Sequence, residues 1–180
     1  EVNTDATDMG IPNIIEDQNM NLLSGEIELM QSSLFLNQVI DSLDLDITYY
    51  SVGEVLDFEL YKSSPFQVQW KSIPSSYFNS NHTIVELDKT QYEITFFNGQ
   101  KVKGQYGIPV LVDGTKLVVQ RVAGLDVDPK NTYTFVLNNR QALRGYFAQG
   151  LLVEPKNFNA NTLRISCQDY NAEKAMYIVN

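Results

Sequence analysis

The residues that most often carry enzyme chemistry are few in this sequence. His82 is the only histidine and Cys167 is the only cysteine. Nucleophilic catalysis by Ser or Cys usually needs a nearby base, and we expect His82 to lie in a solvated loop without organised partners. Cys167 follows an alternating strand, where a free cysteine behaves mostly as a small buried hydrophobe, and a single cysteine excludes an internal disulfide. The sequence therefore predicts no catalytic triad.

Two short acidic pairs have a spacing that could hold a divalent ion, namely Asp44 with Asp46 and Asp126 with Asp128. The same pattern arises often by chance in an acidic chain. The end of a helix explains the first pair, and a turn at Pro129 explains the second. No Gly-Lys-Ser/Thr motif follows a strand, so an ATP site is not expected. We predict neither a bound metal nor a cofactor.

Aromatic and arginine side chains are better candidates for an interaction site. Five aromatic residues of the β-rich region could stack on sugar rings: Tyr49, Tyr50, Trp70, Tyr77 and Tyr92. Trp70 shares one face of its expected strand with Phe66 and Val68, and such a stripe is typical of a core. Arg140 and Arg144 are four residues apart in an expected helix, so they could face an acidic neighbour, another subunit or solvent. We take Trp70, Arg140 and Arg144 as the candidate interaction residues.

Composition limits the remaining classes. The 180 residues are 43% hydrophobic and 11% aromatic, which suits a folded globular chain with a real core. The formal net charge of −9 and the scattered lysines and arginines disfavour nucleic acid as a partner. No apolar run is long enough to span a membrane, and nothing resembles a signal peptide. Because the chain starts at Glu1 and stops at Asn180 inside an expected helix, we expect it to be a fragment of a longer protein.

Helical spacing is clearest near the start of the chain. Apolar residues recur every three or four positions from Leu23 to Leu43 and predict one helix over about 22 to 44, capped by Asn21 or Ser24. A short helix is expected from Arg140, capped by Asn138 or Asn139 and ended by Gly150. A last helix is expected over 171–179.

Period-two patterns rich in β-branched and aromatic residues fill most of the remainder. They predict strands at 47–51, 66–70, 83–87, 92–97, 101–106, 110–112, 116–122, 133–137, 151–154 and 162–167. Asn98-Gly99 and Asp113-Gly114 join neighbouring strands at spacings that favour tight primed turns. The middle of the chain is therefore predicted to be an antiparallel meander.

The order of elements indicates an α+β fold. We expect helices packed on an antiparallel sheet, with the β-rich meander inserted between the first helix and the C-terminal strand and helix. The whole of 1–180 is predicted to be one domain, in which 1–50 and 139–180 form an α/β core and 51–138 form the inserted region.

Three stretches resemble a known family. Residues 21–46, with Glu26-Ile27-Glu28 and the Leu43–Asp46 end, resemble the first periplasmic helix of the polysaccharide chain-length determinant family. Tyr49-Tyr50-Ser51 followed by residues 59–66 is similar to the version found in exopolysaccharide transport proteins of the Bacteroidetes type, many of which are fused to a cytoplasmic tyrosine kinase. Residues 151–155, 163–169 and 172–175 are similar to the strand and helix before the family's long coiled segment, although the family often has Pro at the position of Ala172.

The resemblance implies a periplasmic domain of a polysaccharide co-polymerase, anchored in the bacterial inner membrane by flanking helices that this sequence lacks. The parent would form a homo-oligomer that sets polymer length or gates export of exopolysaccharide or capsule. Its expected partners are the polymerase or export machinery and the polysaccharide itself. This part of such a protein is expected to carry no catalytic site, since the kinase of fused members lies after the second membrane helix.

Two other hypotheses stay open. The aromatic-rich antiparallel region is also compatible with a stand-alone carbohydrate-binding module. A glycoside hydrolase would need two carboxylates brought together by the fold, and spacing along the sequence does not define such a pair.

Overall fold

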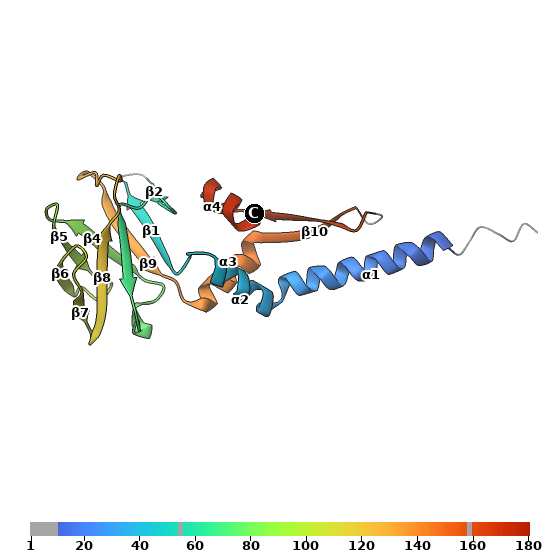
Figure 1. Cartoon of the computed structure of the whole chain (residues 1–180), viewed down its shortest axis with the longest axis horizontal. Helices are drawn as coiled ribbons and strands as arrows, with labels where there is room; N and C mark the ends of the chain where they lie inside the picture. Colours follow the sequence, from blue (N-terminus) through green and yellow to red (C-terminus); the bar gives the residue numbers. More distant parts are fainter. Residues whose placement is uncertain (1–10, 54–55, 158–159) are drawn as a thin grey trace, which may run out of the picture. The chain divides into compact units, whose positions relative to one another are not determined.

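The computed structural model of the chain describes residues 11–53, 56–157 and 160–180 (Figure 1). Residues 1–10, the start of the predicted α/β core, lie outside this part. The chain divides into two compact units. The first unit consists of Glu1–Leu43, Arg144–Asp169 and Ala175–Asn180, and the second of Asp44–Leu143 and Tyr170–Lys174.

The first unit is built from helices and one β-hairpin. Its complete elements are α1 (Ile11–Gln31), α2 (Ser33–Ser42), β10 (Leu151–Asn157) and β11 (Thr162–Cys167). The two strands pair antiparallel, from Leu151 opposite Cys167 to Asn157 opposite Thr162. Two helices, α3 (Arg140–Gly150) and α4 (Ala172–Val179), cross the boundary between the units. Among the described residues, no helix is sufficiently long and apolar to span a membrane.

The first helical region differs from the single helix predicted over 22 to 44. The helix begins earlier, at Ile11, and is interrupted at Ser32, which has extended backbone angles and whose Oγ accepts a hydrogen bond from the backbone N of Phe35 at 3.2 Å. Ser32 is therefore the N-cap of α2. Asn21 and Ser24 lie inside α1, where the Ser24 hydroxyl donates to the carbonyl of Met20, so neither of them is the predicted cap.

The second unit contains two antiparallel sheets that enclose one core (Figure 1). The six-stranded sheet has the order β2-β1-β9-β4-β5-β6, and the three-stranded sheet has the order β3-β8-β7. The elements are β1 (Ile47–Val52), β2 (Asp57–Glu59), β3 (Phe66–Trp70), the 3-10 helix η1 (Ser75–Tyr77), β4 (Asn81–Glu86), β5 (Gln91–Thr95), β6 (Lys101–Gln105), β7 (Val110–Val112), β8 (Thr115–Arg121) and β9 (Thr132–Leu137). The predicted α+β class is confirmed, including a β-rich meander between the first helix and the C-terminal strand and helix.

The core between these sheets is largely aromatic. Along β3, Phe66, Val68 and Trp70 are buried while the two glutamines between them are exposed, which confirms the predicted stripe. The ring of Phe66 meets that of Tyr133 edge to face, with centroids 5.4 Å apart, and Trp70 meets Tyr77 in the same way at 4.8 Å. Each such pair adds roughly 0.5–1.5 kcal/mol beyond its buried area. The first pair joins β3 of one sheet to β9 of the other, and the second attaches η1 to β3.

The two turns predicted to be primed have different outcomes. Asp113 and Gly114 both have positive φ, 45° and 78°, as a type I′ turn requires, so this prediction is confirmed. At the other turn only Gly99 has positive φ, and its N–H donates to the carbonyl of Phe96 at 2.9 Å. That loop is a type I turn followed by a bulge at Gly99, because a single left-handed residue closes it.

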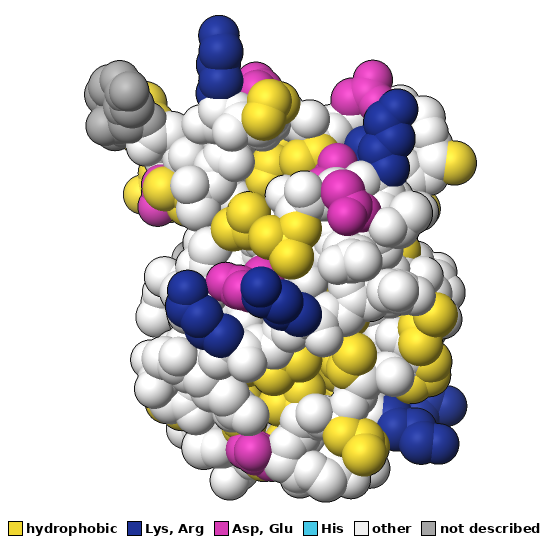
Figure 2. Space-filling view, turned by 90° about the vertical axis from the view of Figure 1, so that its left-hand side faces the viewer, with side chains coloured by type: hydrophobic (Ala, Val, Ile, Leu, Met, Phe, Trp, Pro, Cys, Tyr) yellow, Lys and Arg dark blue, Asp and Glu magenta, His cyan; other side chains and the backbone are white. Residues whose placement is uncertain are grey.

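The surface carries charges of both signs. The space-filling view shows Lys and Arg side chains interspersed with Asp and Glu side chains and with apolar ones (Figure 2). On β5 and β6, Glu93 lies between Lys101 and Lys103, with oxygen-to-nitrogen distances of 3.3 and 3.7 Å. Both lysines are well exposed, so these pairs contribute little to stability.

Candidate functional site

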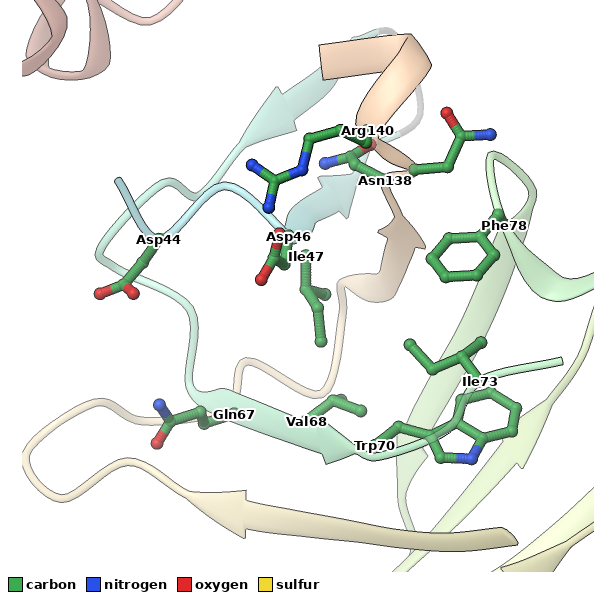
Figure 3. A pocket seen from close by; sticks show the side chains of 11 residues that line it. Asp44, Asp46, Ile47, Gln67, Val68, Trp70, Ile73, Phe78, Asn138 and Arg140 are labelled. Carbon is green, nitrogen blue, oxygen red and sulfur yellow. The ribbon is translucent and has the colours of Figure 1, made fainter. Parts of the chain in front are cut away.

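The second unit contains an open pocket of about 560 Å³ (Figure 3). Three segments line it: the loop before β1, the stretch from β3 to just after η1, and the connection from β9 to α3. The lining residues are Asp44, Asp46, Ile47, Gln67, Val68, Trp70, Ile73, Phe78, Asn138, Asn139 and Arg140. Its volume lies within the range of typical small-molecule sites, about 300–1,000 Å³.

Asn138 holds two of these segments together. Its side-chain Nδ2 donates to the carbonyl of Leu45 and to the hydroxyl of Thr48, both at 2.7 Å, and its backbone N donates to the carbonyl of Asp46 at 2.8 Å. The acidic loop before β1 is therefore fixed against the end of β9. The side chain of Asn138 acts here as a structural clamp, because both hydrogens of its amide nitrogen have acceptors.

Asn139 positions the third segment. Its side-chain Oδ1 accepts a hydrogen bond from the backbone N of Ala142 at 2.8 Å, so Asn139 is the N-cap of α3, one of the two predicted alternatives. Its backbone N donates to the side chain of Asn79 at 3.2 Å, and the backbone N of Asn79 donates to the carbonyl of Leu137 at 2.7 Å. These bonds place Arg140, the first residue of α3, at the rim of the pocket.

The pocket has two chemically different sides. Figure 3 shows Asp44, Asp46 and Arg140 toward one side and the rings of Phe78 and Trp70 toward the other. Trp70 is only 7% exposed and donates its Nε1–H to the Thr115 hydroxyl at 2.6 Å, so it contributes to the wall and does not project into solvent. Phe78 is half-buried and offers more of its ring. The arrangement can bind a molecule that presents an apolar face and several hydroxyl or amide groups.

The predicted interaction residues are brought together only in part. Trp70 and Arg140 line the same pocket, whereas Arg144 belongs to the first unit and does not line it. No local pattern singles out Phe78, which follows a polar stretch, and Asn138 was interpreted only as a possible helix cap. Both residues line the pocket because the fold of the second unit brings together segments that are distant in sequence.

The acidic pairs behave differently. Asp44 and Asp46 line the pocket. Asp128 accepts a hydrogen bond from the backbone N of Lys130 at 2.9 Å, in agreement with the predicted turn at Pro129. Within the described ranges, no group of three or more His, Cys, Asp or Glu residues could hold a metal ion.

The prediction for His82 is wrong. His82 lies in β4 and is fully buried rather than solvated in a loop. Its Nε2 lies 2.9 Å from the carbonyl of Tyr77, which requires a donated hydrogen, and its Nδ1 accepts from the backbone N of Phe97 at 3.4 Å. Burial lowers the pKa of His82, partly offset by the Tyr77 carbonyl, so the ring is a neutral structural group. The polar run before it resembles a loop, but packing among aromatic rings decides its position.

Cys167 is half-buried, so the prediction of a buried core residue is wrong. It ends β11 in the first unit, next to a polar contact in which the Tyr146 hydroxyl donates to the Asp169 carboxylate. Burial, followed by the hydrogen bond and charge of Asp169, raises the pKa of Tyr146. This end of the strand is therefore more polar than its alternating pattern indicates.

The four tyrosines considered for sugar stacking are mainly structural. Tyr77 and Tyr92 are buried in the core of the second unit, and Tyr77 donates its hydroxyl to Asp113 at 2.6 Å. Tyr49 and Tyr50 are half-buried on β1. The hydroxyl of Tyr49 accepts from the backbone N of Val68 at 2.8 Å, and burial raises the pKa of Tyr49 to about 12.

A buried ion pair between Lys174 and Glu59 joins distant parts of the second unit. The Nζ of Lys174 lies 2.8 and 2.9 Å from the two carboxylate oxygens of Glu59, and their side chains are only 9% and 13% exposed. Asn171 donates its side-chain Nδ2 to the carbonyl of Glu59 at 3.1 Å and accepts from the backbone N of Lys174 at 3.1 Å. Asn171 therefore caps α4, and within the second unit it also attaches the first residues of this helix to the end of β2.

No protein-family model matches this chain, and no curated protein matches it. The motifs in the sequence and the contacts that they make in the structure are therefore the basis of any functional proposal.

Proposed function

We propose that this chain is a periplasmic, non-catalytic scaffold of an oligomeric membrane protein that regulates polysaccharide chain length and export. The proposal starts from the resemblance to chain-length determinants, which covers residues 21–46, 49–51, 59–66, 151–155, 163–169 and 172–175. Its partners would be further copies of the same protein, the polymerase or export machinery, and the polysaccharide.

The contact between Glu59 and Lys174 is the observation that carries the proposal. Glu59 begins the motif of residues 59–66, and Lys174 belongs to the C-terminal motif, yet they are 115 residues apart. They form a buried ion pair with two short contacts. An unpaired buried charge would be strongly destabilising, so each motif residue needs the other. This mutual dependence supports the interpretation that both motifs come from one family pattern.

Other residues of the motif also have structural roles. Ser64 is buried, and its hydroxyl donates to the carbonyl of Phe66 at 2.7 Å while accepting from the backbone N of Phe66 at 3.2 Å. The carbonyl of Pro65 accepts from the backbone N of Val122 at 2.9 Å, and the carbonyl of Tyr49 accepts from the backbone N of Leu60 at 2.8 Å. These contacts hold the segment between β2 and β3 in place within the second unit.

The surface of the first unit favours assembly. Large apolar side chains are exposed on α1, on α2, on the hairpin and on the part of α4 that belongs to this unit: Leu22, Leu29, Leu34, Leu152 and Met176 are each more than half exposed. Exposed apolar side chains that form a contiguous patch mark interaction surfaces. We assign them to contacts within the oligomer of the longer protein.

A stand-alone carbohydrate-binding module is the second candidate function. The pocket of the second unit favours it, because aromatic rings and planar polar side chains meet there. The two functions differ in what they require, since a module needs only the pocket whereas a scaffold needs assembly of the parent.

The test uses the full-length parent protein in the organism that encodes it. We expect gene deletion to change the distribution of polymer lengths, and the purified protein to be oligomeric in mild detergent. Complementation with Glu59→Gln should fail to restore the distribution, whereas Lys101→Gln, which changes an exposed ion pair, should restore it. A monomeric parent together with an unchanged polymer distribution after deletion would overturn the proposal.

A further inference from the structure

We propose that the pocket of the second unit is a binding site for a segment of uncharged saccharide. The inference rests on the proposed function in one respect only, namely where the saccharide would come from: a protein that controls polymer length would be in contact with the polymer. The chemistry of the pocket itself carries the rest of the argument.

The shape and lining of the pocket suit a sugar ring. A saccharide has apolar C–H faces and a periphery of hydroxyl groups, so it needs an aromatic or aliphatic wall beside planar polar side chains. The wall is supplied by Phe78, Ile73 and the accessible edge of Trp70. The polar groups are the Asp44 and Asp46 carboxylates, the Gln67 amide and the Arg140 guanidinium, which Figure 3 shows around the same opening.

The polar groups complement hydroxyls in both directions. A hydroxyl is one donor and two acceptors, so it can donate to a carboxylate of Asp44 or Asp46 while accepting from the guanidinium of Arg140. Hydrogen bonds with a charged partner are shorter and stronger than neutral ones, and vicinal hydroxyls match the two oxygens of a carboxylate. A purely apolar ligand would desolvate the carboxylates of Asp44 and Asp46 without offering them a hydrogen-bond donor, which is unfavourable.

Charge selects among saccharides. Two carboxylates and one guanidinium give the pocket a formal charge of −1, and the whole chain carries −9. A polymer rich in uronate or pyruvate groups would be repelled by both. The site therefore fits neutral hexoses or N-acetylated amino sugars.

The pocket is organised before any ligand arrives. Asn138 fixes the Asp46 loop to the end of β9, and Asn139 and Asn79 fix the start of α3 to the segment after η1. A site held in this way loses little conformational entropy on binding. Weak affinity for a short oligosaccharide is then sufficient, because a polymer offers many equivalent segments.

The experiment titrates the 180-residue chain with short oligomers of glucose, galactose, mannose and N-acetylglucosamine, followed by calorimetry and NMR shifts. We expect at least one neutral probe to bind with Kd between ~10 μM and ~1 mM. Phe78→Ala and Asp46→Asn should each weaken binding about tenfold or more, equivalent to about 1.4 kcal/mol. The matched controls Phe58→Ala and Asp126→Asn change exposed residues outside the pocket and should leave binding unchanged.

Three results would overturn the inference: no binding of any neutral probe at about 10 mM, binding that the pocket variants leave unchanged, or a preference for oligouronates. Thermal unfolding of each variant confirms that the fold is kept. Failure here is distinct from failure of the scaffold proposal. If gene deletion alters polymer length but the chain binds no sugar, the scaffold proposal is supported and the pocket inference is wrong. If the chain binds sugar but gene deletion has no effect on polymer length, the pocket inference is supported and the scaffold proposal is wrong.

Discussion

The two units of the chain use their apolar residues in different ways. In the second unit, large side chains such as Tyr92, Phe135 and Leu117 are completely buried between two sheets. In the first unit, a two-stranded hairpin and long helices leave residues such as Leu29 and Leu152 exposed. An isolated hairpin is marginally stable, so it needs packing against other elements. The second unit therefore buries its large side chains in a core of its own, while the first unit leaves several of its large apolar side chains exposed.

The largest expected effect tests this difference directly. Phe135→Ala removes a fully buried ring from the second unit, and we expect it to lower the free energy of unfolding by about 3–5 kcal/mol. Leu29→Ala in the first unit should change it by no more than about 0.5 kcal/mol, because that side chain is already 55% exposed. Urea unfolding of the chain measures both. Similar losses for the two variants would show that the comparison is wrong.

The next effect concerns the buried ion pair of the second unit. Glu59→Gln leaves the ammonium group of Lys174 buried without a countercharge, so we expect a loss of about 3 kcal/mol in urea unfolding. The double variant Glu59→Leu with Lys174→Met replaces both charges by apolar groups and should recover much of that loss. A single variant that loses less than about 1 kcal/mol would mean that water reaches the pair.

A smaller loss of stability is expected when a side chain is introduced at Gly104 in β6, where packing is tight. A Cβ atom at this position would collide with the ring and hydroxyl of Tyr92, which is fully buried. Gly104→Ala should therefore cost about 1–3 kcal/mol. The control is Gly145→Ala in α3, where nothing lies within 4 Å of the added atom and helix propensity favours alanine by about 1 kcal/mol. Thermal melting should move in opposite directions for the two variants.

Much of the fold could be predicted from local patterns. Alternation identified β3 at the observed residues, and Asp-Gly identified the turn at Asp113, because both depend on backbone preferences within a few residues. β2 was missed because it has only three residues and takes its conformation from pairing with β1. The break at Ser32 was also missed, since apolar spacing continues through it and only the hydroxyl of the cap marks the interruption.

The candidate site was less predictable than the fold. Trp70 and Arg140 were singled out individually, but nothing local indicates that they meet Asp46 and Phe78 around one opening. That convergence follows from pairing of β1 with β9, which brings the start and the end of the second unit together. Pockets depend on contacts between distant segments, and a single sequence carries little information about them.

The smallest expected effect is the pH dependence of the free energy of unfolding, which tests whether the core of the second unit is closed to water. The rings of Tyr77, Phe96, Phe97 and Phe135 surround His82, and burial lowers its pKa below the ordinary value. The unfolded chain then binds a proton at His82 more readily than the folded chain does. This contribution to stability is complete above pH of about 6.5 and is lost as the pH falls through the pKa of the folded state.

His82→Gln removes this titration while keeping a neutral hydrogen-bonding side chain. We expect the difference in unfolding free energy between the wild-type chain and this variant to be largest at pH of about 8 and to shrink as the pH falls below about 6.5. Urea unfolding at several pH values measures the difference, and carboxylates that titrate in the same range cancel because both chains contain them. A difference that stays constant with pH would mean that His82 accepts a proton inside the folded unit, and the core around it would then be open to water. In that case the core of the second unit would be less well closed to water than the burial of its side chains indicates. The two units would then differ only in how many large apolar side chains they expose.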